Sequence, residues 1–209
     1  MTSSIELIVY LEPSKEFKQH VEHFLYGCKE KYGPTTANKY SCHITMTGFF
    51  KVNNEEQKGQ FKQSLQESFQ DIHKAPLPQV EKKSHLIRDK MTELPIHLLL
   101  PVLVPDEYYV AMENITRKFD TIAKLRPKKI NHISLAYWDE PQATQEQQRN
   151  WCAAVSGQNL FESIQKDADV YFCNASAPTF WDVVLYQRVK KGELVGESHV
   201  FQEQGRWRV

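Results

Sequence analysis

Apolar residues along the chain switch repeatedly between strand-like and helix-like spacing. Residues 5–11 (IELIVYL) predict a strand, and apolar positions recur at helical spacing over residues 15–31. A second strand is predicted over residues 43–50 (HITMTGFF), where β-branched and aromatic residues dominate. Asn54, followed by two glutamates, predicts the start of a helix that reaches about residue 73.

The same order of elements returns in the second half of the chain. Strands are predicted at residues 96–102, 132–138 and 170–173, and helices at 105–125 and 141–155. His43 and His132, which open the two middle strands, lie 89 residues apart, and the flanking elements repeat at nearly the same offset. Regular alternation of strands and helices can produce such an alignment by chance. Several coincidences at one offset favour an internal duplication.

The end of the chain has a different pattern. Strand-like runs at residues 180–189 and 194–201 flank Gly192, which predicts a hairpin over residues 180–201. A terminal hairpin and duplicated halves favour an α+β fold over a parallel α/β sheet.

We therefore expect one bilobed domain spanning residues 1–209. Its repeat halves, residues 5–90 and 95–175, are expected to be related by a pseudo-twofold axis. Two mainly antiparallel sheets would then face a central groove, with helices on the outside.

The charge balance limits the kind of partner. The 209 residues include 26 Lys and Arg and 26 Asp and Glu, so the formal net charge is zero. A large nucleic-acid footprint usually requires a basic excess, whereas a nucleotide or a short RNA does not.

The four cysteines form no CxxC pair, which argues against a disulfide framework or a zinc finger. The first residues lack the pattern of a signal peptide, and no apolar run could span a bilayer. We expect a cytoplasmic protein without a membrane association.

The candidate chemistry lies on the two histidine strands. Because side chains alternate between the faces of a strand, His43, Thr45 and Thr47 share one face, and Cys42 points away from it. His132 and Ser134 share a face of the second strand in the same way. If the halves are related by a twofold axis, both faces can line one groove.

Two imidazoles and two hydroxyls suit the cleavage of a phosphodiester. Imidazole can take up or release a proton at neutral pH, so one histidine could activate the attacking oxygen while the other protonates the leaving oxygen. The hydroxyls can donate hydrogen bonds to the non-bridging oxygens. This scheme requires no metal and no cofactor.

The two tetrapeptides HITM (43–46) and HISL (132–135) fit the pattern H-x-[ST]-h, in which h is apolar. In this respect the sequence resembles the 2H phosphoesterase superfamily, and it looks closest to the 2',3'-cyclic nucleotide phosphodiesterases. The resemblance covers nearly the whole chain in element order and motif separation. It implies a hydrolase whose substrate is a 2',3'-cyclic nucleotide or a short RNA end. We expect a monomer, and the sequence implies no obligate protein partner.

Carried over by position, the resemblance implies catalytic roles for His43 and His132 and phosphate contacts for Thr45 and Ser134. We favour His132 as the base and His43 as the acid. Two alternatives remain open. The same site could serve a 3'-end RNA exonuclease or a 2'-5' oligoadenylate phosphodiesterase, or the fold could be a non-catalytic module that binds nucleotide or RNA.

Aromatic and basic residues near the motifs are further candidates for substrate binding. Tyr40, Tyr137 and Trp138 could stack on a base or ribose, although core packing is an equal alternative for the last two. Strict alternation favours Trp138, which has the parity of His132, and we expect Phe49 to pack in the core.

Arg126, Lys128 and Lys129 precede the second motif in the segment RPKKINH. Such a run usually forms a solvated loop. It could also steer an anion toward the site, with Lys129 as a substrate-binding candidate.

Overall fold

The computed structural model describes residues 4–70, 72–138 and 159–209. Its strands are β1 (Ile5–Pro13), β2 (Ile44–Thr45), β3 (Phe50–Val52), β4 (Gln79–Val80), β5 (His85–Arg88), β6 (Pro95–Leu103), β7 (His132–Tyr137), β8 (Trp181–Lys190) and β9 (Val200–Arg208). Its helices are α1 (Lys15–Tyr32), α2 (Glu55–Phe69), α3 (Asp106–Phe119) and α5 (Leu160–Phe172), with short 3-10 turns η1 (Thr36–Lys39) and η2 (Ile72–Lys74).

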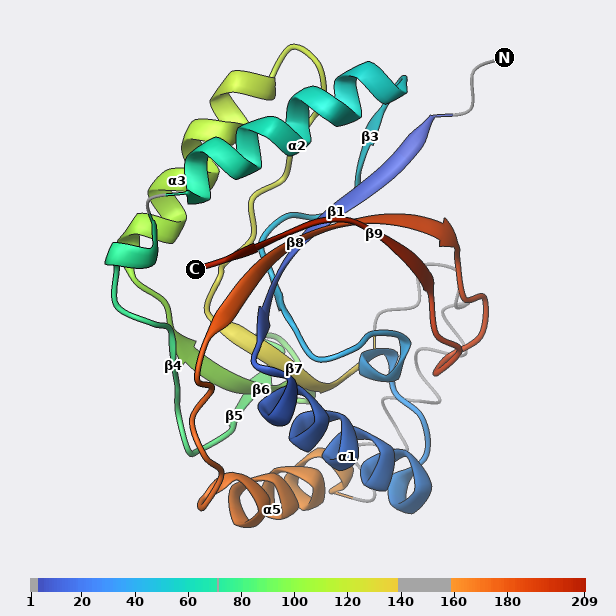
Figure 1. Ribbon diagram of the computed structural model, residues 1–209. Helices are drawn as coiled ribbons and strands as arrows, with labels where there is room; N and C mark the ends of the chain where they lie inside the picture. Colours follow the sequence, from blue (N-terminus) through green and yellow to red (C-terminus); the bar gives the residue numbers. More distant parts are fainter. Residues whose placement is uncertain (1–3, 71, 139–158) are drawn as a thin grey trace.

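The strands form an antiparallel sheet, which confirms the α+β class. The order is β4-β6-β7-β2-β1-β8-β9, with β3 paired to β1 and β5 paired to β6. The expectation of two separate sheets differs from this arrangement. Strand β2 pairs with both β1 and β7, so it joins one wing of strands (β1, β3, β8 and β9) to a second wing (β4, β5, β6 and β7). The two wings can be seen in Figure 1. The strand that links the wings is therefore the one that follows His43.

The helices lie on the outside of the sheet in two pairs, α1 with α5 and α2 with α3 (Figure 1). Helix α5 contacts β5 and β6, whereas α2 contacts β3 and β9. Each pair combines one helix from each half of the chain. The lobes of the fold are thus assembled from both halves rather than from one half each.

Helices α1 and α2 follow the predicted patterns. Helix α1 buries Phe17, Val21, Phe24 and Leu25, whose spacing places them on one face. Helix α2 begins after Asn54, whose Oδ1 accepts a hydrogen bond of 2.9 Å from the backbone N–H of Gln57. This is the N-cap expected from the sequence.

Residues 170–173 do not form the predicted strand. They lie at the end of α5, which buries Phe161, Ile164, Ala168 and Phe172 at helical spacing. A short apolar run cannot by itself distinguish a strand from the last turn of a helix. The predicted helix at 141–155 lies outside the described residues.

The terminal hairpin is formed by β8 and β9, but β9 covers residues 200–208 instead of the predicted 194–201. The connection between them has its own hydrogen bonds. The Glu197 carboxylate accepts from the backbone N–H groups of Glu193 and Leu194, and His199 Nδ1 accepts from that of Gly192 at 2.8 Å. These local bonds replace strand pairing in the segment before Val200.

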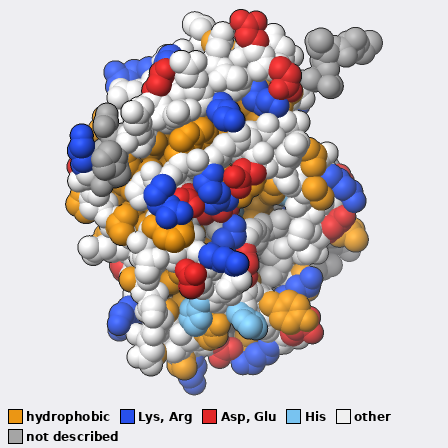
Figure 2. All heavy atoms as spheres, in the orientation of Figure 1, with side chains coloured by type: hydrophobic (Ala, Val, Ile, Leu, Met, Phe, Trp, Pro, Cys, Tyr) orange, Lys and Arg blue, Asp and Glu red, His pale blue; other side chains and the backbone are white. Residues whose placement is uncertain are grey.

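No helix in the described part of the chain is both long and apolar enough to cross a membrane. Cys28, Cys42 and Cys173 carry free thiols, and Cys152 lies outside the described residues. On the face shown in Figure 2, acidic and basic side chains are interspersed rather than gathered by sign. This face therefore offers no large basic surface.

Candidate active site

The two histidine motifs lie on neighbouring strands that pair directly with each other. In the antiparallel pair of β2 and β7, Ile44 lies opposite Ile133. This register places His43 opposite Ser134 and brings Thr45 opposite His132. Because directly opposite residues share a face, both imidazoles and both hydroxyls lie on the same side of the sheet.

The burial pattern agrees with this register. Ile44 and Ile133 are fully buried, whereas the two histidines and two hydroxyl residues are partly exposed. Directly opposite residues have Cβ atoms about 4.5–5.5 Å apart, so these four side chains can contact one small ligand. We refer below to His43, Thr45, His132 and Ser134 as the motif quartet.

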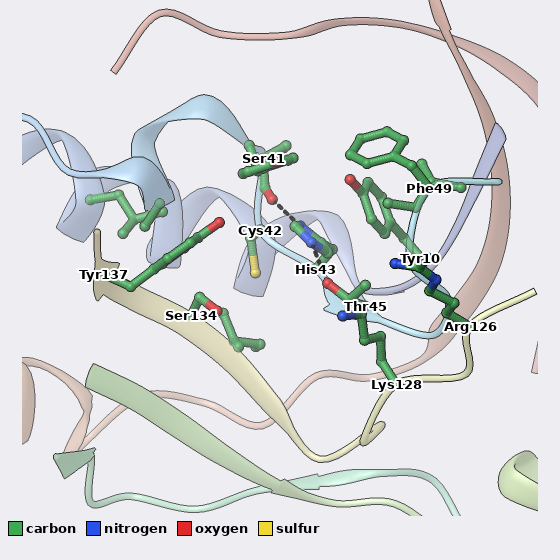
Figure 3. A pocket seen from close by; sticks show the side chains of 16 residues that line it. Tyr10, Ser41, Cys42, His43, Thr45, Phe49, Arg126, Lys128, Ser134 and Tyr137 are labelled. Carbon is green, nitrogen blue, oxygen red and sulfur yellow. Dashed lines mark hydrogen bonds between the residues drawn. The ribbon is translucent and has the colours of Figure 1, made fainter. Parts of the chain in front are cut away.

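Backbone and side-chain contacts fix the orientation of His43. Its Nδ1 lies 2.6 Å from the carbonyl oxygen of Ser41, and its Nε2 lies 3.0 Å from Thr45 Oγ1 (Figure 3). A carbonyl can only accept, so Nδ1 carries the proton in the neutral ring and Nε2 carries the lone pair. Tyr10 stacks on the imidazole with ring centroids 3.8 Å apart.

His132 is oriented in a similar way. Its Nδ1 lies 2.9 Å from the side-chain oxygen of Asn131, which can only accept. The lone pair of the neutral ring therefore also lies on Nε2. Both histidines thus present the same ring atom for proton transfer.

Burial shifts the pKa of both motif histidines downward. Desolvation lowers the pKa of His43 from 6.5 to about 4, and the charge of His132 adds a smaller decrease. Desolvation also lowers the pKa of His132. Because both pKa values lie below 6.5, both rings are mainly neutral at pH 7.

A pocket of about 370 Å³ opens over this face of the sheet (Figure 3). Its lining includes His43, Thr45 and Ser134 of the motif quartet. His132 is outside the lining in the described part of the chain, one residue before Ile133, which belongs to it. Other residues of the lining come from β1, the segment around η1 and the loop before β7, and they include Tyr10, Tyr40, Ser41, Cys42, Arg126, Lys128 and Tyr137.

A bulge in β7 decides which aromatic residue faces the pocket. Strand β6 pairs Leu98 with Ala136 but Leu99 with Ser134, so the register skips one residue of β7. The skip reverses the alternation after Leu135. Tyr137 consequently joins the face of Ser134 and lines the pocket, which reverses the preference for Trp138. Trp138 is not among the lining residues of the described structure.

A second irregularity follows the first motif. Both Met46 and Thr47 donate their backbone N–H to the carbonyl of Val9, at 3.0 and 3.4 Å. Thr47 is fully buried, and its Oγ1 accepts from the backbone N–H of Val9 at 3.1 Å, so its expected place on the site face is wrong. Phe49 lines the pocket instead of packing in the core.

The basic loop lies against this irregular segment. The backbone N–H of Gly48 donates to the carbonyl of Arg126 at 2.8 Å, and the backbone N–H of Lys128 donates to the carbonyl of Met46 at 3.0 Å. Arg126 and Lys128 thereby reach the pocket, whereas Lys129 is not part of the lining within the described residues. A Cβ at Gly48 would lie 3.4 Å from Lys128 Cε, so the lysine side chain passes close to Gly48.

Sequence reasoning missed several residues of the site, among them Tyr10 and His97. Tyr10 lies opposite Thr45 on β1, and its position between the apolar residues Val9 and Leu11 of a predicted strand was a usable signal. His97 belongs to neither motif, yet its Nε2 lies 3.0 Å from Ser134 Oγ. The sequence holds no signal for that contact, because it depends on the pairing of β6 with β7. Cys42 belongs to the lining although it was expected to point away; burial raises the pKa of its thiol well above the usual value.

No protein-family model and no curated protein matches the chain. Among solved structures, the chain is similar to E. coli LigT complexed with 3'-AMP, with 9% identity, 99% of both chains covered and a TM-score of 0.49. It is also similar to Kluyveromyces marxianus Usb1 with uridine monophosphate, with 10% identity, 94% of this chain and 96% of the other covered, and a TM-score of 0.45. These values are too low to establish a common activity, so the function has to be inferred from the residues of the site.

Proposed function

We propose that this protein is a metal-independent phosphodiesterase of the 2H type that hydrolyses 2',3'-cyclic nucleotide phosphates or short RNA ends. One observation carries the proposal, namely the register that places the motif quartet on one face of the β2–β7 pair. Two imidazoles and two hydroxyls then lie on the same side of the sheet, where one phosphate can contact them. This set contains every group that an acid-base displacement at phosphorus requires.

In the proposed reaction, the cyclic phosphate binds between the imidazoles, and Ser134 donates a hydrogen bond to a non-bridging oxygen. Once His43 Nε2 is protonated it no longer accepts the Thr45 proton, and Thr45 then donates to a second non-bridging oxygen. The neutral base takes a proton from water as the water oxygen attacks phosphorus. The protonated acid gives its proton to the departing ribose oxygen, and the P–O bond of the ring breaks. The product is a nucleotide phosphomonoester, and the two imidazoles have exchanged protonation states.

We assign His43 as the acid and His132 as the base. Burial lowers the pKa of His43 to about 4, so the ring is neutral at pH 7 in the free enzyme and must gain its proton when the substrate binds. A bound phosphate anion between the rings stabilises the proton that the acid must carry.

The charges of the pocket support an anionic substrate. Arg126 and Lys128 are the charged residues apart from histidine in the described lining, which contains no carboxylate. They supply the positive charge that the neutral histidines lack. A pocket of about 370 Å³ is suited to a mononucleotide or the end of a short RNA.

The test is turnover of a panel of 2',3'-cyclic nucleotides in excess EDTA, with His43→Ala and His132→Ala as separate variants. Each variant should lose about 10²–10⁴-fold in kcat, because each removes one proton-transfer group. Circular dichroism and thermal unfolding control for the fold. Near-normal turnover by either variant would show that paired acid-base catalysis is wrong.

The same panel separates the alternatives. Faster cleavage of a 2'-5' or 3'-5' oligomer than of the cyclic mononucleotide would favour an oligonucleotide-cleaving enzyme. Binding of nucleotides without turnover of any substrate would favour a binding module.

A further inference from the structure

A third histidine lies beside the motif quartet. His97 is on β6, directly opposite Tyr137 of β7. Its Nε2 is 3.0 Å from Ser134 Oγ, and its ring lies edge-on to His132 with centroids 5.6 Å apart and an interplanar angle of 89°. His97 therefore contacts both residues of the second motif that face the site.

The β7 bulge creates this contact. Tyr137 and Ser134 are an odd number of positions apart, so in a regular strand they would point to opposite faces. The skipped register brings both onto the face of His97, whose ring centroid lies 4.8 Å from that of Tyr137. Burial and the neighbouring His132 lower the pKa of His97 to about 4, so His97 is neutral at pH 7.

The two hydroxyls of the motif quartet have different partners. Thr45 Oγ1 contacts His43, the histidine of its own motif, at 3.0 Å. Ser134 Oγ contacts His97, which belongs to neither motif. The second half of the site thus uses an additional residue to hold its hydroxyl.

The proton count defines what His97 can do. A serine hydroxyl has a single proton, and phosphate oxygens accept hydrogen bonds from it. If His97 Nε2 accepted that proton, Ser134 would have no donor left for the phosphate. If Nε2 carries a proton and donates to Oγ, the Ser134 proton remains available for the phosphate.

We propose that His97 is a positioning residue that donates a hydrogen bond from Nε2 to Ser134 and thereby directs the Ser134 hydroxyl proton onto the scissile phosphate. This inference rests on the proposed phosphodiesterase function. His97 transfers no proton to the substrate and acts only through Ser134.

The experiment is a double-mutant cycle of His97→Leu and Ser134→Ala, measured as kcat and KM on the best cyclic nucleotide in EDTA. His97→Leu should lower kcat about 10-fold, the value of one oriented hydrogen bond. If His97 acts through Ser134 and not through its edge-on contact with His132, the double variant should be no slower than Ser134→Ala alone. His97→Gln, whose amide can donate from a position near that of Nε2, should restore kcat to within about 3-fold of the wild type.

His85→Leu is the matched control, since His85 is an exposed histidine on the neighbouring strand β5. It should leave kcat unchanged. If His97→Leu does not fold, His97→Asn takes its place in the cycle, because its shorter amide cannot reach the position of Nε2.

Additive losses in the double variant, or equal losses in His97→Gln and His97→Leu, would overturn the role of His97. So would wild-type kcat in His97→Leu. These results would leave the proposed function intact, provided that the wild type is active and His43→Ala and His132→Ala are not. Retained activity in those two variants would overturn the proposed function itself.

Discussion

At the scale of single residues, the site depends on how each imidazole is held. Ser41 and Asn131 accept the Nδ1 protons of His43 and His132, so both rings present Nε2 for proton transfer. Tyr10 covers one face of the His43 ring and contributes to its desolvation. The chemistry of the histidines is thus set by neighbours that lie outside the H-x-[ST]-h pattern.

Lys128 provides a test of the charge in the pocket. Lys128→Ala should lower kcat/KM about 5-fold at low salt, the effect of removing one cation near an anionic substrate, and the loss should shrink as salt rises. The measurement is initial rates at low and high ionic strength. Lys129→Ala is the matched control, because this neighbour is exposed and outside the described lining. An equal effect of both substitutions would show that general surface charge, and not the pocket, attracts the substrate.

At the scale of elements, a break in strand alternation after each motif determines which residues face the pocket. The segments 43–48 and 132–137 have the same order of partly exposed and buried positions. In both, the fourth and fifth residues are consecutive buried positions. The break in alternation brings Tyr137 into the pocket and sends Thr47 into the core. This equivalence supports the proposal of an internal duplication, in which the bulge was copied together with the motif.

The N-cap of α2 offers a prediction about stability. Asn54→Ala should lower the free energy of unfolding by about 1 kcal/mol, because it leaves the backbone N–H of Gln57 without its partner. Urea denaturation measures the change. Asn53→Ala is the control, since Asn53 takes part in the turn through its backbone N–H, which donates to Gln57. Equal losses in both variants would contradict the assignment of the cap.

At the scale of the whole molecule, the site exists only because the two halves meet. Strand β2 has two residues, yet it joins β1 on one side to β7 on the other. The motif quartet lies across this junction, with one motif on each strand. A change in the relative position of the two wings would separate the imidazoles, so folding and site geometry are coupled.

The histidines of this region also predict how stability depends on pH. Burial lowers the pKa values of His43, His97 and His199 from 6.5 to about 4. Between pH 6.5 and pH 4 the unfolded chain binds protons at these residues that the folded protein does not bind. The stability that depends on these neutral histidines is therefore fully present above pH 6.5. As the pH falls through this window, the free energy of unfolding decreases.

Urea denaturation at pH 7, 6 and 5 measures this dependence. His97→Gln removes one of these titrating groups, so the free energy of unfolding of the variant should decrease less steeply as the pH falls. A shift of one pKa unit corresponds to about 1.4 kcal/mol. A constant free energy of unfolding from pH 7 to pH 5 would contradict the lowered pKa values.

The sequence by itself determined the local part of this structure. Apolar periodicity predicted α1, α2, β1, β6 and β8, because burial of one face imposes a period of 3.6 or 2. The histidine and hydroxyl pairs were found for the same reason, since alternation places residues two apart on one face.

Only the tertiary structure decided how the two motifs meet and what surrounds them. The register of β2 with β7, the bulge that selects Tyr137, and the contact of His97 with Ser134 all depend on residues far apart in the chain. A strand pattern defines faces, but it carries no information about which strand lies beside it or where the alternation breaks. The quartet was therefore predictable as two halves, and its assembly into one site was not.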